Sequence, residues 1–288
     1  MWLWAAAAMA VALFDYDRGV PLEYRSEPFP QKVEDVRVSG ASLRGVDGGR
    51  VNMVVMAPLT ARARRPAVIY QHGGGQTMLT YFPEAVAMAR AGAIAVIPDP
   101  PAAVEGRTGD MRRMDAGQVR DWYVRVLVAE RRVLDWLASR GDVDMTRVAY
   151  VGHSYGGMTG AMLAAVEPRI KAYVLIGPAG SAARHVAESP SAFWREWRAA
   201  RSAEQLATDR EVIAAVDPLR YAGEGKSRPK LVQCERWEVD PSLDCEGLAK
   251  AMGAEVRLYE TDHAFADYRA GLDRMAFVGR QLGLRVKP

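Results

Sequence analysis

Cysteine is scarce in this sequence, and its scarcity excludes two kinds of small protein. Only two cysteines, Cys234 and Cys245, occur among 288 residues. Two thiols cannot build a scaffold of several disulfides or a zinc site made of cysteines. They could form one bridge, but we expect two reduced thiols.

An excess of charge and a long apolar run are missing too. The 38 basic and 35 acidic residues leave a net charge of +3 and are scattered, so no nucleic-acid-binding surface is indicated. One apolar run, residues 1–14, is too short to cross a bilayer as a helix. It could be the core of a signal peptide cleaved after the Ala-Met-Ala at residues 8–10, which would imply secretion, but no basic residue precedes it. We favour a mis-started N-terminus or a short helix on the domain, and a cytoplasmic protein.

Strand-like and helix-like segments alternate from residue 33 onward, which predicts an α/β fold with a mostly parallel sheet covered by helices. The first two strands, at 33–38 and 50–56, flank a Gly-rich turn and predict an N-terminal antiparallel hairpin. Further strands are expected at 66–70, 93–97, 147–151, 172–176, 230–234 and 255–259. Helices are expected at 81–91, 117–140, 158–166, 243–252 and 264–282.

The predicted organisation is one domain over residues 33–288, preceded at 1–32 by the apolar segment and a Pro-rich extended arm. Residues 180–216 are helical in propensity and have no strand of their own, so we expect a small helical lid there. The lid contains Phe193, Trp194 and Trp197. Trp194 and Trp197 either line a substrate pocket or pack inside the lid, and the sequence does not decide between the two.

Residues 152–156, Gly-His-Ser-Tyr-Gly, fit the pattern G-x-S-x-G between an apolar strand and a small-residue helix. A tight turn in that context strains the central residue and presents its side chain at the carboxyl edge of the sheet. The small flanking residues keep neighbouring chain segments from clashing. Ser154 is therefore the candidate nucleophile.

A serine nucleophile needs a base, and the chain has only four histidines. His263 follows the strand at 255–259, where a loop at the carboxyl edge should deliver the base. His72 is expected to be structural, His153 a packing residue and His185 an exposed lid residue.

The acid that orients the base should follow the strand at 230–234, because the triad order Ser, Asp or Glu, His is expected in this topology. The loop there contains Glu235, Glu238 and Asp240. We favour Glu238, keep Asp240 as the alternative, and consider Glu235 too close to the end of the strand.

A Gly-rich segment, residues 72–75, follows the strand at 66–70. Glycines let backbone N–H groups approach a developing oxyanion, and each such donor lowers the barrier by about 3 kcal/mol. The N–H of Tyr155 and that of Gly73 or Gly74 are the candidate donors. Neither a dinucleotide-binding motif nor a Walker lysine follows, which argues against a phosphate site.

Three motifs together resemble the α/β-hydrolase superfamily: H-G-G-G at 72–75, G-H-S-Y-G-G at 152–157 and D-H-A-F at 262–265. The hairpin, the small lid and the last motif are similar to dienelactone-hydrolase-like and prolyl-oligopeptidase-like serine esterases. The resemblance implies an α/β-hydrolase fold and a triad of Ser154, His263 and an acid after the seventh core strand. Two features depart from the pattern. True dienelactone hydrolases use a cysteine nucleophile, whereas this chain has Ser154. The usual acid is Asp, whereas the acid favoured here is Glu238.

These observations favour a serine carboxylic-ester hydrolase that acts through an acyl-enzyme on small to medium ester molecules. No metal or organic cofactor is required, and oligomeric state is left open. A peptidase or amidase of the prolyl-oligopeptidase type is one alternative, although the β-propeller usual in such peptidases is missing. A non-catalytic binding member of the fold is the other.

Overall fold

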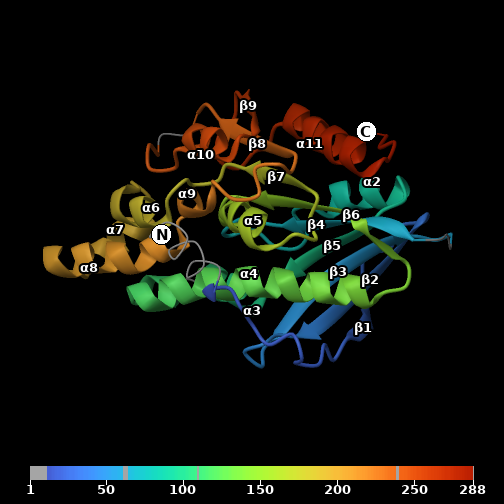
Figure 1. The fold of residues 1–288 in the computed structure, drawn as a ribbon, viewed down its shortest axis with the longest axis horizontal. Helices are drawn as coiled ribbons and strands as arrows, with labels where there is room; N and C mark the ends of the chain where they lie inside the picture. Colours follow the sequence, from blue (N-terminus) through green and yellow to red (C-terminus); the bar gives the residue numbers. More distant parts are fainter. Residues whose placement is uncertain (1–11, 61–63, 109, 238–239, 288) are drawn as a thin grey trace.

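The computed structural model describes residues 12–60, 64–108, 110–237 and 240–287, and a mixed sheet lies at its centre (Figure 1). The strands are β1 (Arg25–Pro28), β2 (Val36–Arg44), β3 (Arg50–Pro58), β4 (Arg65–Gln71), β5 (Ile94–Asp99), β6 (Val143–His153), β7 (Ala172–Ile176), β8 (Lys230–Glu235) and β9 (Glu255–Tyr259). Every predicted strand is present, although β2 begins three residues after and ends six residues after the strand expected at 33–38. Strand β1 was not predicted: part of the expected Pro-rich arm pairs with β2.

The strand order is β1-β2-β3-β5-β4-β6-β7-β8-β9. Strands β1, β2, β3 and β5 pair antiparallel, which confirms the N-terminal hairpin, and β5, β4, β6, β7, β8 and β9 pair in parallel. Because parallel strands end at one edge, the loops after β4, β6, β8 and β9 meet there. Candidate residues that are far apart in the sequence therefore come from neighbouring loops.

Helices cover both faces of the sheet (Figure 1). They are α2 (Phe82–Arg90), α3 (Pro101–Thr108), α4 (Ala116–Ser139), α5 (Tyr155–Val166), α6 (Ala182–Glu188), α7 (Ala192–Ala199), α8 (Ala203–Ile213), α9 (Pro218–Tyr221), α10 (Cys245–Met252) and α11 (Tyr268–Leu282), with 3-10 turns η1 (Asp110–Arg113) and η2 (Ala214–Val216). Helices α2 and α11 share one core, and α4, α5 and α10 share the other. Alternation along β4 supplies both cores: Val68 and Tyr70 face the first, and Ile69 faces the second.

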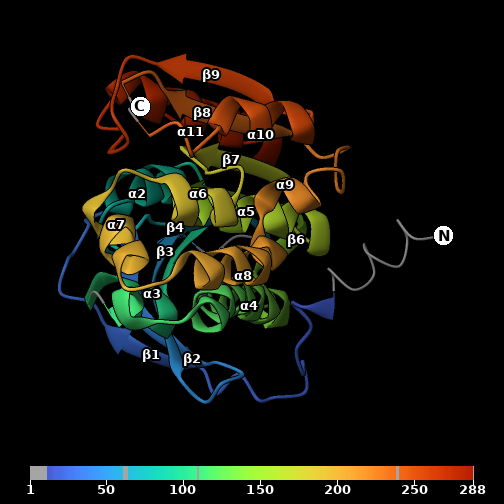
Figure 2. The same ribbon diagram turned by 90° about the vertical axis from the view of Figure 1, so that its left-hand side faces the viewer.

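The predicted helical insertion forms α6, α7, α8 and η2 (Figure 2). Helix α8 packs on α4, and α7 packs on η1. Part of the segment between β5 and α4 is helical, as α3 and η1. Among the described residues, no helix is long and apolar enough to cross a membrane. Most of the apolar N-terminal run lies outside the described residues, but Phe14 is fully buried against Tyr221.

Glu130 is an exception to the apolar packing around α4. Its side chain is completely buried, and neither carboxylate oxygen has a hydrogen-bond partner among the described residues. Burial raises the pKa of Glu130 to about 8, because the charged form loses its hydration and gains no partner. The folded state therefore holds this proton more tightly than the unfolded chain, where the glutamate pKa is about 4.5.

This raised pKa predicts that Glu130 costs stability as pH rises. Below the unfolded pKa of about 4.5, this group leaves the free energy of unfolding unchanged. As the pH rises from there through the folded pKa of about 8, the free energy of unfolding falls by on the order of several kcal/mol in total. We expect Glu130→Gln to raise the melting temperature, and to do so more at about pH 9 than at about pH 5. Thermal unfolding of both proteins across that range measures the difference. An unchanged difference between the two proteins across the range would contradict the burial argument.

Candidate active site

Ser154 occupies the sharp turn between β6 and α5. Its backbone has φ 55° and ψ −117°, a conformation that L-residues rarely adopt and that projects the side chain out of the turn. The flanking glycines make the turn physically feasible. A Cβ on Gly152 would lie 2.2 Å from the carbonyl oxygen of Gly156, and a Cβ on Gly156 would lie 2.6 Å from that of Gln71. The local sequence thus places the half-buried hydroxyl of Ser154 at the carboxyl edge of the sheet.

His263 lies in the loop between β9 and α11, and its Nε2 is 2.9 Å from Oγ of Ser154. In this arrangement the serine hydroxyl donates to the ring nitrogen. His153 Nε2 lies 2.7 Å from the backbone carbonyl oxygen of His263 and donates to it. Burial lowers the pKa of His153 to about 3, so its ring is neutral and Nε2 carries the proton for this bond. The residue expected only to pack therefore also anchors the loop that carries the candidate base.

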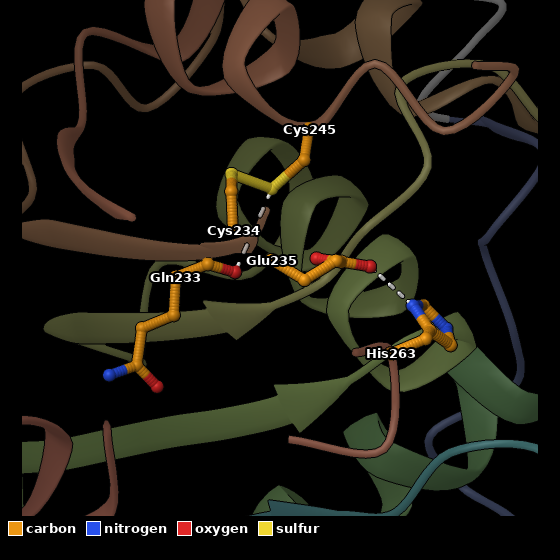
Figure 3. The surroundings of a disulfide bond; sticks show 5 residues. All are labelled: Gln233, Cys234, Glu235, Cys245 and His263. Carbon is orange, nitrogen blue, oxygen red and sulfur yellow. Dashed lines mark hydrogen bonds and ion pairs between the residues drawn. A yellow bond between two sulfur atoms is a disulfide. The ribbon is translucent and has the colours of Figure 1, made fainter. Parts of the chain in front are cut away.

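Glu235, the last residue of β8, supplies the carboxylate that contacts the other ring nitrogen. Its Oε1 lies 2.5 Å from Nδ1 of His263, and its side chain is 2% exposed (Figure 3). The expectation that Glu235 is too close to the strand end was wrong. The two methylenes of the Glu235 side chain let its carboxylate reach His263 from the end of the strand.

The two acids favoured from the sequence have different outcomes. Glu238 lies outside the described residues. Asp240 is directed elsewhere: its carboxylate accepts hydrogen bonds from Ser189, at 2.5 Å, and from Ser242, and lies 3.5 Å from Nδ1 of His185. The alternative acid is therefore corrected: the carboxylate of Asp240 accepts from two serines and lies beside His185, whereas Glu235 contacts His263.

The candidate oxyanion donors are distinguished by their partners. The N–H of Gly73 donates to Oε1 of Gln76 at 2.7 Å, so this amide is engaged within its own loop. Gly74 borders the pocket beside Ser154, and its N–H has no acceptor among the described residues. Tyr155 is the first residue of α5, where helix amides favour negative charge. Of the two glycines, the geometry favours Gly74.

His72 has the structural environment expected from the sequence. Its ring is fully buried, with Nε2 3.2 Å from Oδ1 of Asp99. Nδ1 of the same ring lies 3.3 Å from the hydroxyl of Tyr155, which also accepts a bond from Gln71. This network fixes the end of β4 against the start of α5.

A largely apolar pocket of about 250 Å³ opens beside Ser154. Trp194 lines it, as one interpretation of the lid aromatics predicted. Trp197 does not: its Nε1 donates to the carbonyl oxygen of Met114 at 2.9 Å, and the Arg201 guanidinium stacks 3.3 Å from its ring centre. Its assignment to substrate binding is therefore corrected, because the ring packs between Arg201 and the backbone at Met114, outside the pocket lining. His185, expected to be exposed, also lines the pocket and is mostly buried.

The two cysteines form a disulfide, so the expectation of reduced thiols was wrong. Cys234 precedes Glu235 on β8, and Cys245 opens α10 (Figure 3). The chain returns over the strand end to start this helix, which brings the two Cα atoms within 5.9 Å. The bridge closes the loop that begins with Glu235.

A family model described as alpha/beta hydrolase fold matches residues 66–244, more than half of the chain. The chain belongs to this family. The superfamily resemblance drawn from the three motifs is thereby confirmed, together with the fold that it implied. No curated protein sequence matches the chain significantly.

Solved structures agree on the fold. An acetyl xylan esterase from Paenibacillus sp. R4 superposes with a TM-score of 0.73 at 18% identity, covering 95% of this chain and 92% of that one. Acetyl xylan esterase 1 from Thermoanaerobacterium sp. JW/SL YS485 gives 0.72 at 16% identity, covering 97% and 93%. A prolyl endopeptidase structure gives 0.67 at 18% identity, covering 90% of this chain but 40% of that one. At these identities the likeness concerns the fold alone.

Proposed function

We propose that the chain is a serine carboxylic-ester hydrolase that works through an acyl-enzyme. The observation that carries the proposal is the continuous line of contacts from Ser154 Oγ through His263 to Glu235. A hydroxyl, an imidazole and a carboxylate in that order form the arrangement that activates a serine. The line ends at a pocket in which an ester could lie.

In the proposed mechanism, Ser154 Oγ attacks the ester carbonyl carbon while His263 Nε2 takes the hydroxyl proton. Glu235 accepts from Nδ1 of the ring, holds its tautomer and stabilises the imidazolium. The N–H groups of Tyr155 and Gly74 bind the tetrahedral oxyanion. The C–O bond to the alcohol then breaks, and His263 returns its proton to the leaving alkoxide. A water deprotonated by His263 finally hydrolyses the acyl-enzyme and frees Ser154.

Two esterases among the similar structures support an ester rather than an amide substrate, because both are matched over almost their whole length. The prolyl endopeptidase contains much chain that has no counterpart here. We therefore expect turnover of p-nitrophenyl acetate and little cleavage of aminoacyl nitroanilides. Faster cleavage of the anilides would favour the peptidase alternative, and no cleavage of either substrate would favour a non-catalytic member of the fold.

The pocket volume predicts a preference for short acyl chains, and Trp194 is expected to set it. Across p-nitrophenyl esters from acetyl to palmitoyl, we expect short chains to be hydrolysed roughly tenfold faster or more. Trp194→Ala enlarges the pocket and should shift the optimum to longer chains. Trp197→Ala is the matched control, because that ring packs against Arg201 and Met114 and does not line the pocket: it should lower the melting temperature and keep the wild-type order of chain lengths. The same order in Trp194→Ala would contradict the assignment.

A further inference from the structure

His185 has a chain of hydrogen bonds behind it that the proposed reaction does not use. Its Nδ1 lies 2.9 Å from Oγ of Ser242, and that hydroxyl contacts Oδ1 of Asp240. Asp240 also accepts from the Ser242 N–H and from the Ser189 hydroxyl. Burial raises the pKa of Asp240, but the bonds from Ser189 and Ser242 outweigh it and hold the pKa below the ordinary value. Asp240 is therefore ionised at neutral pH.

This chain fixes which ring nitrogen of His185 carries the proton. An ionised carboxylate only accepts, so the single hydroxyl hydrogen of Ser242 is directed to Asp240. The Ser242 oxygen must then accept from Nδ1–H of His185. Burial also lowers the pKa of His185 to about 4, and the nearby His263 and Arg198 act in the same direction. Together they outweigh the negative charge of Asp240, which raises the pKa. The ring is neutral at pH 7, and Nε2 is an unprotonated acceptor.

The ring borders the same pocket as Ser154 and packs edge-on against Trp194. No polar group of the described residues contacts Nε2. The other side chains that line the pocket are largely apolar, among them Phe193 and Met111. A lone acceptor on an apolar wall favours a ligand that brings a hydrogen-bond donor, since leaving it unpaired on binding costs free energy.

We propose that His185 is a specificity residue whose Nε2 accepts a hydrogen bond from a hydroxyl group on the substrate. The substrate class is accordingly a small ester that carries a free hydroxyl. A neutral hydroxyl fits better than an ammonium group, because the pocket is apolar and the charge of Arg198 acts on the ring. This inference rests on the proposed ester hydrolysis and narrows its substrate.

Two matched ester pairs test the proposal, one for each side of the ester bond. Hydroxyethyl acetate and propyl acetate differ by hydroxyl against methyl on the alcohol; ethyl glycolate and ethyl propanoate differ in the same way on the acyl group. Acid release in a pH-stat gives kcat/KM for each. In at least one pair, the wild-type preference for the hydroxyl ester should exceed the preference seen in alkaline hydrolysis without enzyme by about tenfold, which is the effect of a hydrogen bond near 1.4 kcal/mol.

His185→Phe keeps an aromatic ring against Trp194 and removes the acceptor, so the ratio within that pair should fall to near the ratio that the two esters show in alkaline hydrolysis without enzyme. His185→Gln restores a side-chain acceptor and should recover part of the ratio, and it remains informative if the phenylalanine variant fails to fold. Arg184→Leu, the adjacent residue of α6, pairs with Glu188 at the surface and serves as the matched control with the wild-type ratio.

These measurements distinguish a failure of the His185 proposal from a failure of the proposed ester hydrolysis. Wild-type ratios no higher than those of alkaline hydrolysis without enzyme in both pairs, or a higher ratio that survives in His185→Phe, would overturn the role of His185 and leave ester hydrolysis standing. Absence of hydrolysis of all four esters and of p-nitrophenyl acetate would overturn the proposed function itself.

Discussion

Ser154→Ala is expected to abolish ester hydrolysis, with a fall in kcat of roughly a millionfold to the level left by binding and oxyanion contacts alone. The variant lacks the only atom that the mechanism joins to the acyl group. Alanine is smaller than serine, and the hydroxyl of Ser154 makes no helix-capping bond, so the fold should persist. Initial rates with p-nitrophenyl acetate, beside the melting temperature, measure both effects.

Ser139→Ala is the matched control for this substitution. Ser139 ends α4, and its hydroxyl donates to the backbone oxygen of Trp136 at 2.7 Å, outside the pocket. This variant should keep the wild-type rate. Substantial hydrolysis by a folded Ser154→Ala protein would show that another group is the nucleophile.

Glu235→Gln is expected to lower kcat by about three to four orders of magnitude, with little change in KM. Glutamine has nearly the same shape but no charge, so it cannot stabilise the imidazolium formed when Ser154 loses its proton. Its amide can also donate to Nδ1 and so hold the wrong tautomer of His263. Steady-state kinetics with p-nitrophenyl acetate separate the effect on kcat from that on KM.

Two neighbouring acids provide the comparison for this substitution. Glu238→Gln tests the acid favoured from the sequence, and Asp240→Asn tests the alternative. The contact between Glu235 and His263 predicts the largest loss of kcat in Glu235→Gln. If Glu238→Gln showed the largest loss instead, the carboxylate of the triad would be Glu238.

Features that adjacent residues encode could be predicted from the sequence. The turn at Ser154 is written into adjacent residues, because Gly152 and Gly156 allow a backbone approach that a Cβ would prevent. The strands followed from short apolar runs. His263 followed from chain order and from the small number of histidines.

Features that depend on side-chain reach or on chain path could not be predicted in the same way. Glu235 contacts His263 because its side chain is long enough to extend from the strand end, and the spacing of acids along the loop does not predict that contact. Cys234 and Cys245 pair because the chain folds back to begin α10. His185 faces the pocket because α6 folds over the sheet edge, and no sequence pattern distinguishes that histidine from a surface one.

Labelling with a fluorophosphonate probe tests the central claim most directly, because the probe reacts with a serine only where a base has activated it. The account predicts one adduct per chain, located by peptide mass spectrometry at Ser154, with its formation strongly slowed in Glu235→Gln. An adduct at another residue, or an unlabelled protein that still hydrolyses p-nitrophenyl acetate, would contradict the account.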